Sequence, residues 1–65
     1  MQIVTRTYYL PRNKLGRLLM YYIAKQTACS IGKIYIVNDT IAFPITLPKQ
    51  NIIQVENILQ RYDLL

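Results

Sequence analysis

Residues 33–45 read KIYIVNDTIAFPI. The two halves, Lys33–Val37 and Thr40–Ile45, are rich in β-branched and aromatic residues, which is typical of strands. Between them, Asn38 and Asp39 tolerate the positive φ angles of a two-residue hairpin turn. The sequence therefore predicts a β-hairpin at this point of the chain.

The pairing across this turn favours one buried face. If Val37 lies opposite Thr40, the large apolar residues of the two strands fall on the same side, because directly opposite residues share a face. That side carries Ile34, Ile36, Ile41 and Phe43. Pro44 has no N–H to donate to a ladder, so we expect its strand to lie at an edge of the sheet.

Before the hairpin, the sequence predicts a strand followed by a helix. Residues 2–10 alternate loosely in β-branched and aromatic types, and Pro11 ends the run. Asn13 is a suitable N-cap for a helix that extends to about Ala28, although Gly16 weakens it by about 1 kcal/mol relative to Ala. The helical spacing gives an inward stripe of Leu15, Leu18, Leu19, Tyr22 and Ile23.

After the hairpin, the sequence predicts a second helix. Asn51 and Gln54 resemble a capping box, and an alternative start uses Thr46 as the cap with Pro48 in the first turn. The inward stripe consists of Ile52, Val55, Leu59 and Tyr62. The side chains that point away from it are Gln54, Asn57, Gln60 and Arg61.

The resulting order is β-α-β-β-α in a single α+β domain that spans residues 1–65. We expect a small antiparallel sheet with two helices on one face, which is the ferredoxin-like plan without its last strand. The missing strand leaves one sheet edge unpaired, and such an edge favours pairing with a second chain. A chain of this length buries only roughly 60% of its unfolded surface, so we also predict a homo-oligomer.

The composition narrows the class of protein. With one Cys and no His, the chain is expected to hold no disulfide, no metal and no cofactor. The longest apolar run, Leu18–Ala24, is much shorter than the ~20 residues of a membrane span. The lone Cys29 fits a reducing compartment, so we expect a cytoplasmic protein without membrane contact.

Positive charge is concentrated in the first half of the chain. The net charge is +5, and every charged residue before Asp39 is Arg or Lys. Such a surface favours polyanions and acidic proteins as partners. Without His, and with Glu56 and Asp63 far from Asp39 in the sequence, no general base or carboxylate pair is apparent. We therefore expect a binding protein and not an enzyme.

One candidate binding surface is the sheet face that the helices leave open. If the first strand buries Ile3 and Tyr9, its other residues join the hairpin residues on that face. The resulting basic, aromatic platform consists of Arg6, Tyr8, Lys33 and Tyr35. Similar platforms stack bases in single-stranded RNA-binding sheets. In the opposite register Tyr8 turns inward and the platform loses half its members. The alternative to a ligand is that an identical subunit covers this sheet face.

The other candidate surface is the outward side of the first helix. It carries Lys14, Arg17, Met20, Tyr21, Ala24, Lys25 and Ala28. Tyr21 would anchor a partner that Lys14 and Arg17 attract. Together with Arg12, these two residues also place positive charge near free helix N–H groups, where anions bind. A solvated basic face without a ligand is the alternative interpretation.

The leading functional hypothesis is a nucleic-acid-associated regulator of the size that phages, plasmids and bacteria encode. Phosphates would be met by Arg6, Arg12, Lys14, Arg17 and Lys33, and bases by Tyr8 and Tyr35. The alternative is an inhibitor, adaptor or assembly subunit whose basic helix docks on an acidic protein surface. A third possibility is an assembly protein that binds only copies of itself.

Overall fold

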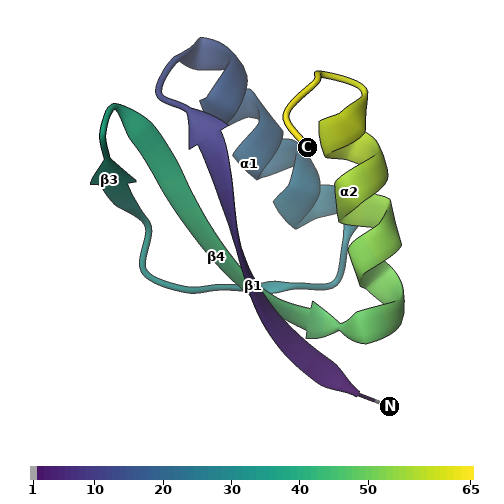
Figure 1. The fold of residues 1–65 in the computed structure, drawn as a ribbon. Helices are drawn as coiled ribbons and strands as arrows, with labels where there is room; N and C mark the ends of the chain where they lie inside the picture. The colour runs from purple at the N-terminus through teal and green to yellow at the C-terminus, as the bar shows by residue number, and fades with distance from the viewer. Residues whose placement is uncertain (1) are drawn as a thin grey trace.

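A computed structural model describes residues 2–65 of the chain and shows an α+β fold, as the sequence predicted (Figure 1). The first strand, β1, spans Ile3–Pro11 and the first helix, α1, spans Lys14–Gln26. Three strands follow: β2 (Ser30–Ile31), β3 (Tyr35–Val37) and β4 (Thr40–Pro48). A 3₁₀ turn, η1 (Lys49–Asn51), then leads into the second helix, α2 (Ile52–Gln60).

The sheet is antiparallel and is built around β4. β1 pairs with one side of β4 over its full length, while β2 and β3 pair with the other side. The order is β1-β4-β2 with β3 off this path, which does not confirm the ferredoxin-like order. The prediction that Pro44 lies on an edge strand is wrong, because β4 has neighbours on both sides.

A bulge explains how the central strand accommodates Pro44. Ile31 pairs with Ile45 and Tyr35 with Ala42, so three residues, 32–34, lie opposite the two residues 43–44. The Pro44 carbonyl accepts from Gly32 N at 2.9 Å. In an antiparallel ladder the nitrogen and carbonyl of one residue face the same neighbour, so the missing N–H of Pro44 faces this bulge. The predicted strand Lys33–Val37 is therefore shortened to β3, and β2 forms separately.

The hairpin itself is confirmed. Asn38 and Asp39 have φ angles of 49° and 63°, as a type I′ turn requires. Ile36 lies opposite Ile41, and Val37 opposite Thr40, as the sequence predicted. However, the face is only partly buried, since Ile36 in the short edge strand keeps 48% of its surface exposed.

Both helices pack on the same side of the sheet and enclose the core with it (Figure 1). The sheet contributes alternate residues of β1 and β4, since successive side chains point to opposite faces. These residues are Tyr8, Leu10, Ile41, Phe43, Ile45 and Leu47. From the helices come Leu19, Ile23, Val55, Ile58 and Leu59.

Helix α1 is rotated relative to the predicted stripe. The Asn13 side chain caps the helix as predicted, accepting from Gly16 N at 3.0 Å. Gly16 is buried, and a Cβ there would overlap the Pro11 carbonyl oxygen, so this glycine allows α1 to approach the end of β1. With Gly16, Leu19 and Ile23 facing inward, three residues of the predicted stripe keep 38–56% of their surface exposed: Leu15, Leu18 and Tyr22.

The end of α1 and the start of α2 also differ from the predictions. Helix α1 stops at Gln26, and the Thr27 hydroxyl donates to the Ile23 carbonyl at 2.8 Å. The predicted capping box before α2 is wrong, because Asn51 makes no side-chain cap hydrogen bond after the 3₁₀ turn. Tyr62 lies beyond α2 and is exposed instead of belonging to its buried stripe.

Candidate functional site

The predicted sheet platform is not formed. Tyr8 lies opposite Phe43 in the β1–β4 register and is only 7% exposed. Arg6 lies two residues away on the same, helix-covered side, opposite Ile45. The interpretation that placed Arg6 and Tyr8 on the open side with Tyr35 is therefore wrong, and the opposite register holds.

Tyr8 instead connects β1 to α2. Its hydroxyl donates to Oε2 of Glu56 at 3.1 Å. Burial, then this hydrogen bond and the Glu56 charge, raise the pKa of Tyr8 to about 12, while Arg6 opposes the shift. Tyr8 is a structural residue in this fold and offers no aromatic surface to a ligand.

The sheet side away from the helices, which we name the open face, carries no charged residue in its four strands. All of its residues are uncharged: Ile3, Thr5, Thr7, Tyr9, Pro11, Ser30, Tyr35, Val37, Thr40, Ala42, Pro44, Thr46 and Pro48. Tyr9 and Tyr35 both lie opposite Ala42 and cover it, so Ala42 is fully buried although both rings are half exposed. Lys33 is exposed in the bulge beside this face and has no strand partner.

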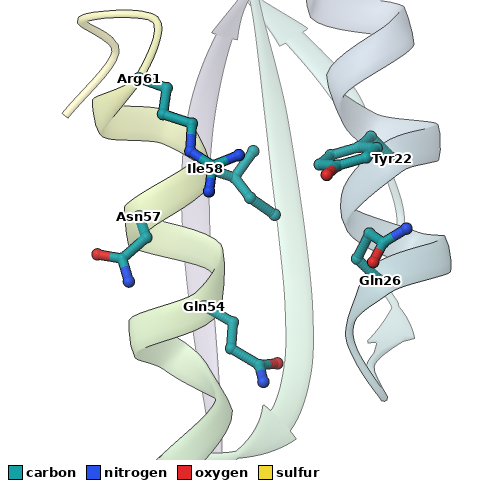
Figure 2. Close-up of a pocket in the computed structure, with 6 residues that line it drawn as sticks. All are labelled: Tyr22, Gln26, Gln54, Asn57, Ile58 and Arg61. Atoms are coloured by element: carbon teal, nitrogen blue, oxygen red, sulfur yellow. The ribbon is translucent and has the colours of Figure 1, made fainter.

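A hollow separates the two helices, and Figure 2 shows its polar half. Two adjoining depressions of about 270 Å³ and 310 Å³ make up this helix groove. The polar half is lined by Tyr22, Gln26, Gln54, Asn57, Ile58 and Arg61. The apolar half is lined by Leu15, Leu18, Leu19, Tyr22, Arg61 and Tyr62. Tyr22 on α1 and Arg61, the residue directly after α2, belong to both halves and point into the gap from opposite sides (Figure 2).

The helix groove combines exposed apolar surface with one free cation. Leu18 keeps 56% of its surface exposed at the apolar end. Within residues 2–65 the ion pair present is Arg12 Nη1 to Asp39 Oδ1, at 3.5 Å, so Arg61 has no carboxylate partner there. Amide groups of Gln26, Gln54 and Asn57 can donate or accept hydrogen bonds at the other end.

Basic residues continue from the helix groove onto the outer side of α1. Lys14, Arg17 and Lys25 are exposed, and α1 contains no acidic residue. Tyr21, the most exposed large hydrophobic residue of this helix at 75%, lies among them. The structure thus keeps three of the predicted site residues, Lys14, Arg17 and Tyr21, on one helix. Arg12 is held by Asp39 at the end of β1.

Two kinds of feature are absent from the described part of the chain: clusters of metal-ligating side chains and membrane-spanning helices. Residues 2–65 contain no cluster of His, Cys, Asp or Glu that could hold a metal ion. Cys29 is partly buried against the core. Neither described helix has the length and apolar character needed to cross a bilayer.

Sequence reasoning missed the helix groove because its two walls lie far apart in the chain. Arg61 was correctly predicted to point away from the core, and Tyr22 was wrongly assigned to the buried stripe. Nothing in the spacing of either helix indicates that these two side chains face each other. Comparison of the chain with protein-family models, curated proteins and solved structures gives no match.

Proposed function

We propose that the protein is a small non-catalytic binding module that docks a partner protein in the helix groove and on the basic side of α1. The observation that carries this proposal is the row of apolar side chains that α1 leaves exposed beside an unpaired arginine. The row consists of Leu15, Leu18 and Tyr22. Exposed apolar patches on a small protein commonly mark interaction sites, because their burial by a partner is more favourable than their exposure to water.

The expected partner segment is amphipathic and acidic. Its apolar side chains would enter the apolar half of the groove, against Leu18 and Tyr62. Its carboxylates would meet Arg61 in the groove and Arg17 on α1, where no acidic residue of the helix competes. Helix-in-groove recognition commonly combines such apolar anchors with charges that set orientation and association rate.

A display library of acidic amphipathic peptides provides the test. We expect selected peptides to bind the wild-type chain and to lose at least about tenfold in affinity on Leu18→Asp, which corresponds to about 1.4 kcal/mol. Ile53→Asp is the matched control, because Ile53 is at least as exposed as Leu18 but lies outside the residues that line the groove. Failure to select any peptide, or an equal loss in both variants, would refute the proposal.

Nucleic acid remains the second candidate ligand, and one observation favours it. Lys14, Arg17 and Lys25 lie exposed along one acid-free helix of a chain with net charge +5. The stacking component of that hypothesis now lacks Tyr8, so phosphate contacts from α1 would carry the binding. A gel-shift titration with single- and double-stranded DNA and RNA at low salt tests it. There Arg17→Glu should weaken binding, while the uncharged substitution Leu18→Asn leaves it unchanged.

Two finer statements belong to the same proposal. A cytoplasmic location is supported by the single, partly buried Cys29, which has no disulfide partner. The ferredoxin-like plan without its last strand is supported by the position of β4 between β1 and β2, which are joined through α1. Subcellular fractionation tests the cytoplasmic location. An experimental structure tests the ferredoxin-like plan.

A further inference from the structure

β1 has a free edge along its whole length. In the described chain it lies at the end of the sheet order, with β4 as its neighbour on the other side. The Gln2 carbonyl accepts from Lys49 N at 2.8 Å, so even-numbered residues of β1 direct their backbone groups toward β4. In an antiparallel ladder the alternate residues point the other way. The N–H and C=O groups of Ile3, Thr5, Thr7 and Tyr9 therefore point outward.

This edge carries almost none of the features that protect edge strands. Natural edges are usually short, bulged, or interrupted by Lys and Pro. β1 is nine residues long and is continuously paired with β4. Its one charged residue is Arg6, and its one proline, Pro11, stands at the very end. Such an edge is a template for another strand.

We propose that β1 pairs antiparallel with β1 of a second copy of this chain, so that two sheets join into one across a two-fold axis at Thr7. This register aligns the two strands over their full length, with Ile3 opposite the partner's Pro11. Pro11 supplies no N–H, and its carbonyl already accepts from Asn13 N at 2.9 Å. The new ladder therefore ends where the strand ends.

The charge on Arg6 selects both the register and the occupant. An axis at Arg6 would place two guanidinium groups directly opposite each other, which is unfavourable. With the axis at Thr7, Arg6 lies opposite the partner's Tyr8 on the helix-covered side. The Tyr8 hydroxyl binds Glu56, a carboxylate that takes part in no ion pair within residues 2–65. Each Arg6 thus gains the partner's Glu56 as a counter-ion, and the relation is reciprocal, as two-fold symmetry requires.

The open face also favours a second copy. Two chains of net charge +5 repel each other unless the joined surfaces bring few like charges together. On the open side of the proposed junction, Thr5 lies opposite the partner's Tyr9 and Thr7 lies opposite the partner's Thr7. No charged residue occurs on that side of β1. Opposite charges meet on one side of the joined sheet, and uncharged residues meet on the other.

Amide hydrogen exchange by NMR, read together with mass from light scattering, tests the pairing at single residues. The amides of Arg6 and Tyr8 face β4 and are protected in a monomer as well as in a dimer. The amides of Thr5, Thr7 and Tyr9 face outward, so we expect slow exchange for them together with a dimer mass. A monomeric mass at millimolar concentration, or fast exchange of these three amides in a dimer, would overturn the proposal.

Two sets of variants locate the interface. Thr7→Lys adds two like charges at the axis and should raise the dimer dissociation constant by at least about tenfold. Val37→Lys is the matched control, since it adds the same charge to the open face at the opposite edge of the sheet. Arg6→Glu should weaken the dimer, and adding Glu56→Arg should restore it. Equal weakening by Thr7→Lys and Val37→Lys, or no restoration in the double variant, would contradict the edge pairing or its register.

Discussion

At the scale of single residues, the hydroxyl of Tyr8 gives the fold a dependence on alkaline pH. Its pKa rises from 10.0 to about 12 on folding, mainly through burial. Between these values the unfolded chain loses the Tyr8 proton while the folded chain keeps it. The stabilisation is therefore complete below pH 10 and is lost as the pH rises toward 12, by about 2 kcal/mol in total.

Urea unfolding between pH 8 and 11.5 measures this effect, with Tyr8→Phe as the test variant. Tyr8→Phe should unfold more easily at pH 8, by about 1 kcal/mol, because it loses the bond to Glu56. Its free energy of unfolding should then fall less steeply with pH than that of the wild type. Tyr21→Phe is the control, since Tyr21 is exposed. Parallel pH profiles for wild type and Tyr8→Phe would contradict the argument.

Gly16 offers a second prediction at this scale, and its sign opposes helix propensity. In an open helix, Gly→Ala stabilises by about 1 kcal/mol. Here the new Cβ would overlap the Pro11 carbonyl oxygen, so α1 must move away from β1. We expect Gly16→Ala to destabilise by about 2 kcal/mol or more. Thermal unfolding measures it, and a stabilised variant would show that α1 does not lie this close to β1.

At the scale of elements, we predict that a substitution in the hairpin turn can increase the stability of the fold. Asn38 and Asp39 both adopt positive φ, and glycine takes this conformation without the steric cost that Asp39 bears. Asp39→Gly should therefore stabilise the fold by about 0.5 kcal/mol, even though it removes the exposed ion pair to Arg12. Asp39→Asn separates the two effects, because it removes only the charge. Chemical denaturation tests the expected order, in which Asp39→Gly is the most stable protein, wild type comes next and Asp39→Asn is the least stable.

The sequence was sufficient for elements that are governed by local chemistry. The Asn38–Asp39 turn, the Asn13 cap and the polar side of α2 all follow from residues close together in the chain. Their interactions are complete within a few residues, as in the bond from Gly16 N to Asn13. The exposure of Lys14, Arg17 and Tyr21 was predictable for the same reason, since the charges of α1 can be read from its sequence.

The orientation of elements depended on contacts that the sequence does not display. In β1, Tyr8 and Tyr9 are adjacent, and either could face the core. Pairing with β4 decides that Tyr8 faces the core and Tyr9 the open face. In α1, apolar residues occur almost all round the helix, and the contact of Gly16 with Pro11 decided which of them face inward. The error in β1 buried the predicted site residue Tyr8, and the error in α1 exposed the predicted core residues Leu15, Leu18 and Tyr22, because a change of face exchanges buried and exposed side chains.

At the scale of the whole molecule, the two proposed surfaces use different parts of the fold. The helix groove lies between α1 and α2, whereas the free edge belongs to β1, on the border of the sheet. A dimer joined at β1 would leave both grooves open, so each dimer would present two docking sites to partner proteins. Linking two sites in this way raises the apparent affinity for a partner with two docking segments.

Dimerisation through β1 also predicts how stability depends on protein concentration. A 65-residue domain has a small core, and a strand added at a bare edge increases the burial of both chains. Because two chains associate on folding, a tenfold higher concentration should raise Tm by about 3–5 °C for wild type. Thr7→Lys, whose dimer is weakened under the same proposal, should show a lower Tm than wild type at the same concentration, down to the concentration at which both are monomeric. Differential scanning calorimetry over two decades of concentration measures both, and a concentration-independent wild-type Tm would mean that β1 remains unpaired.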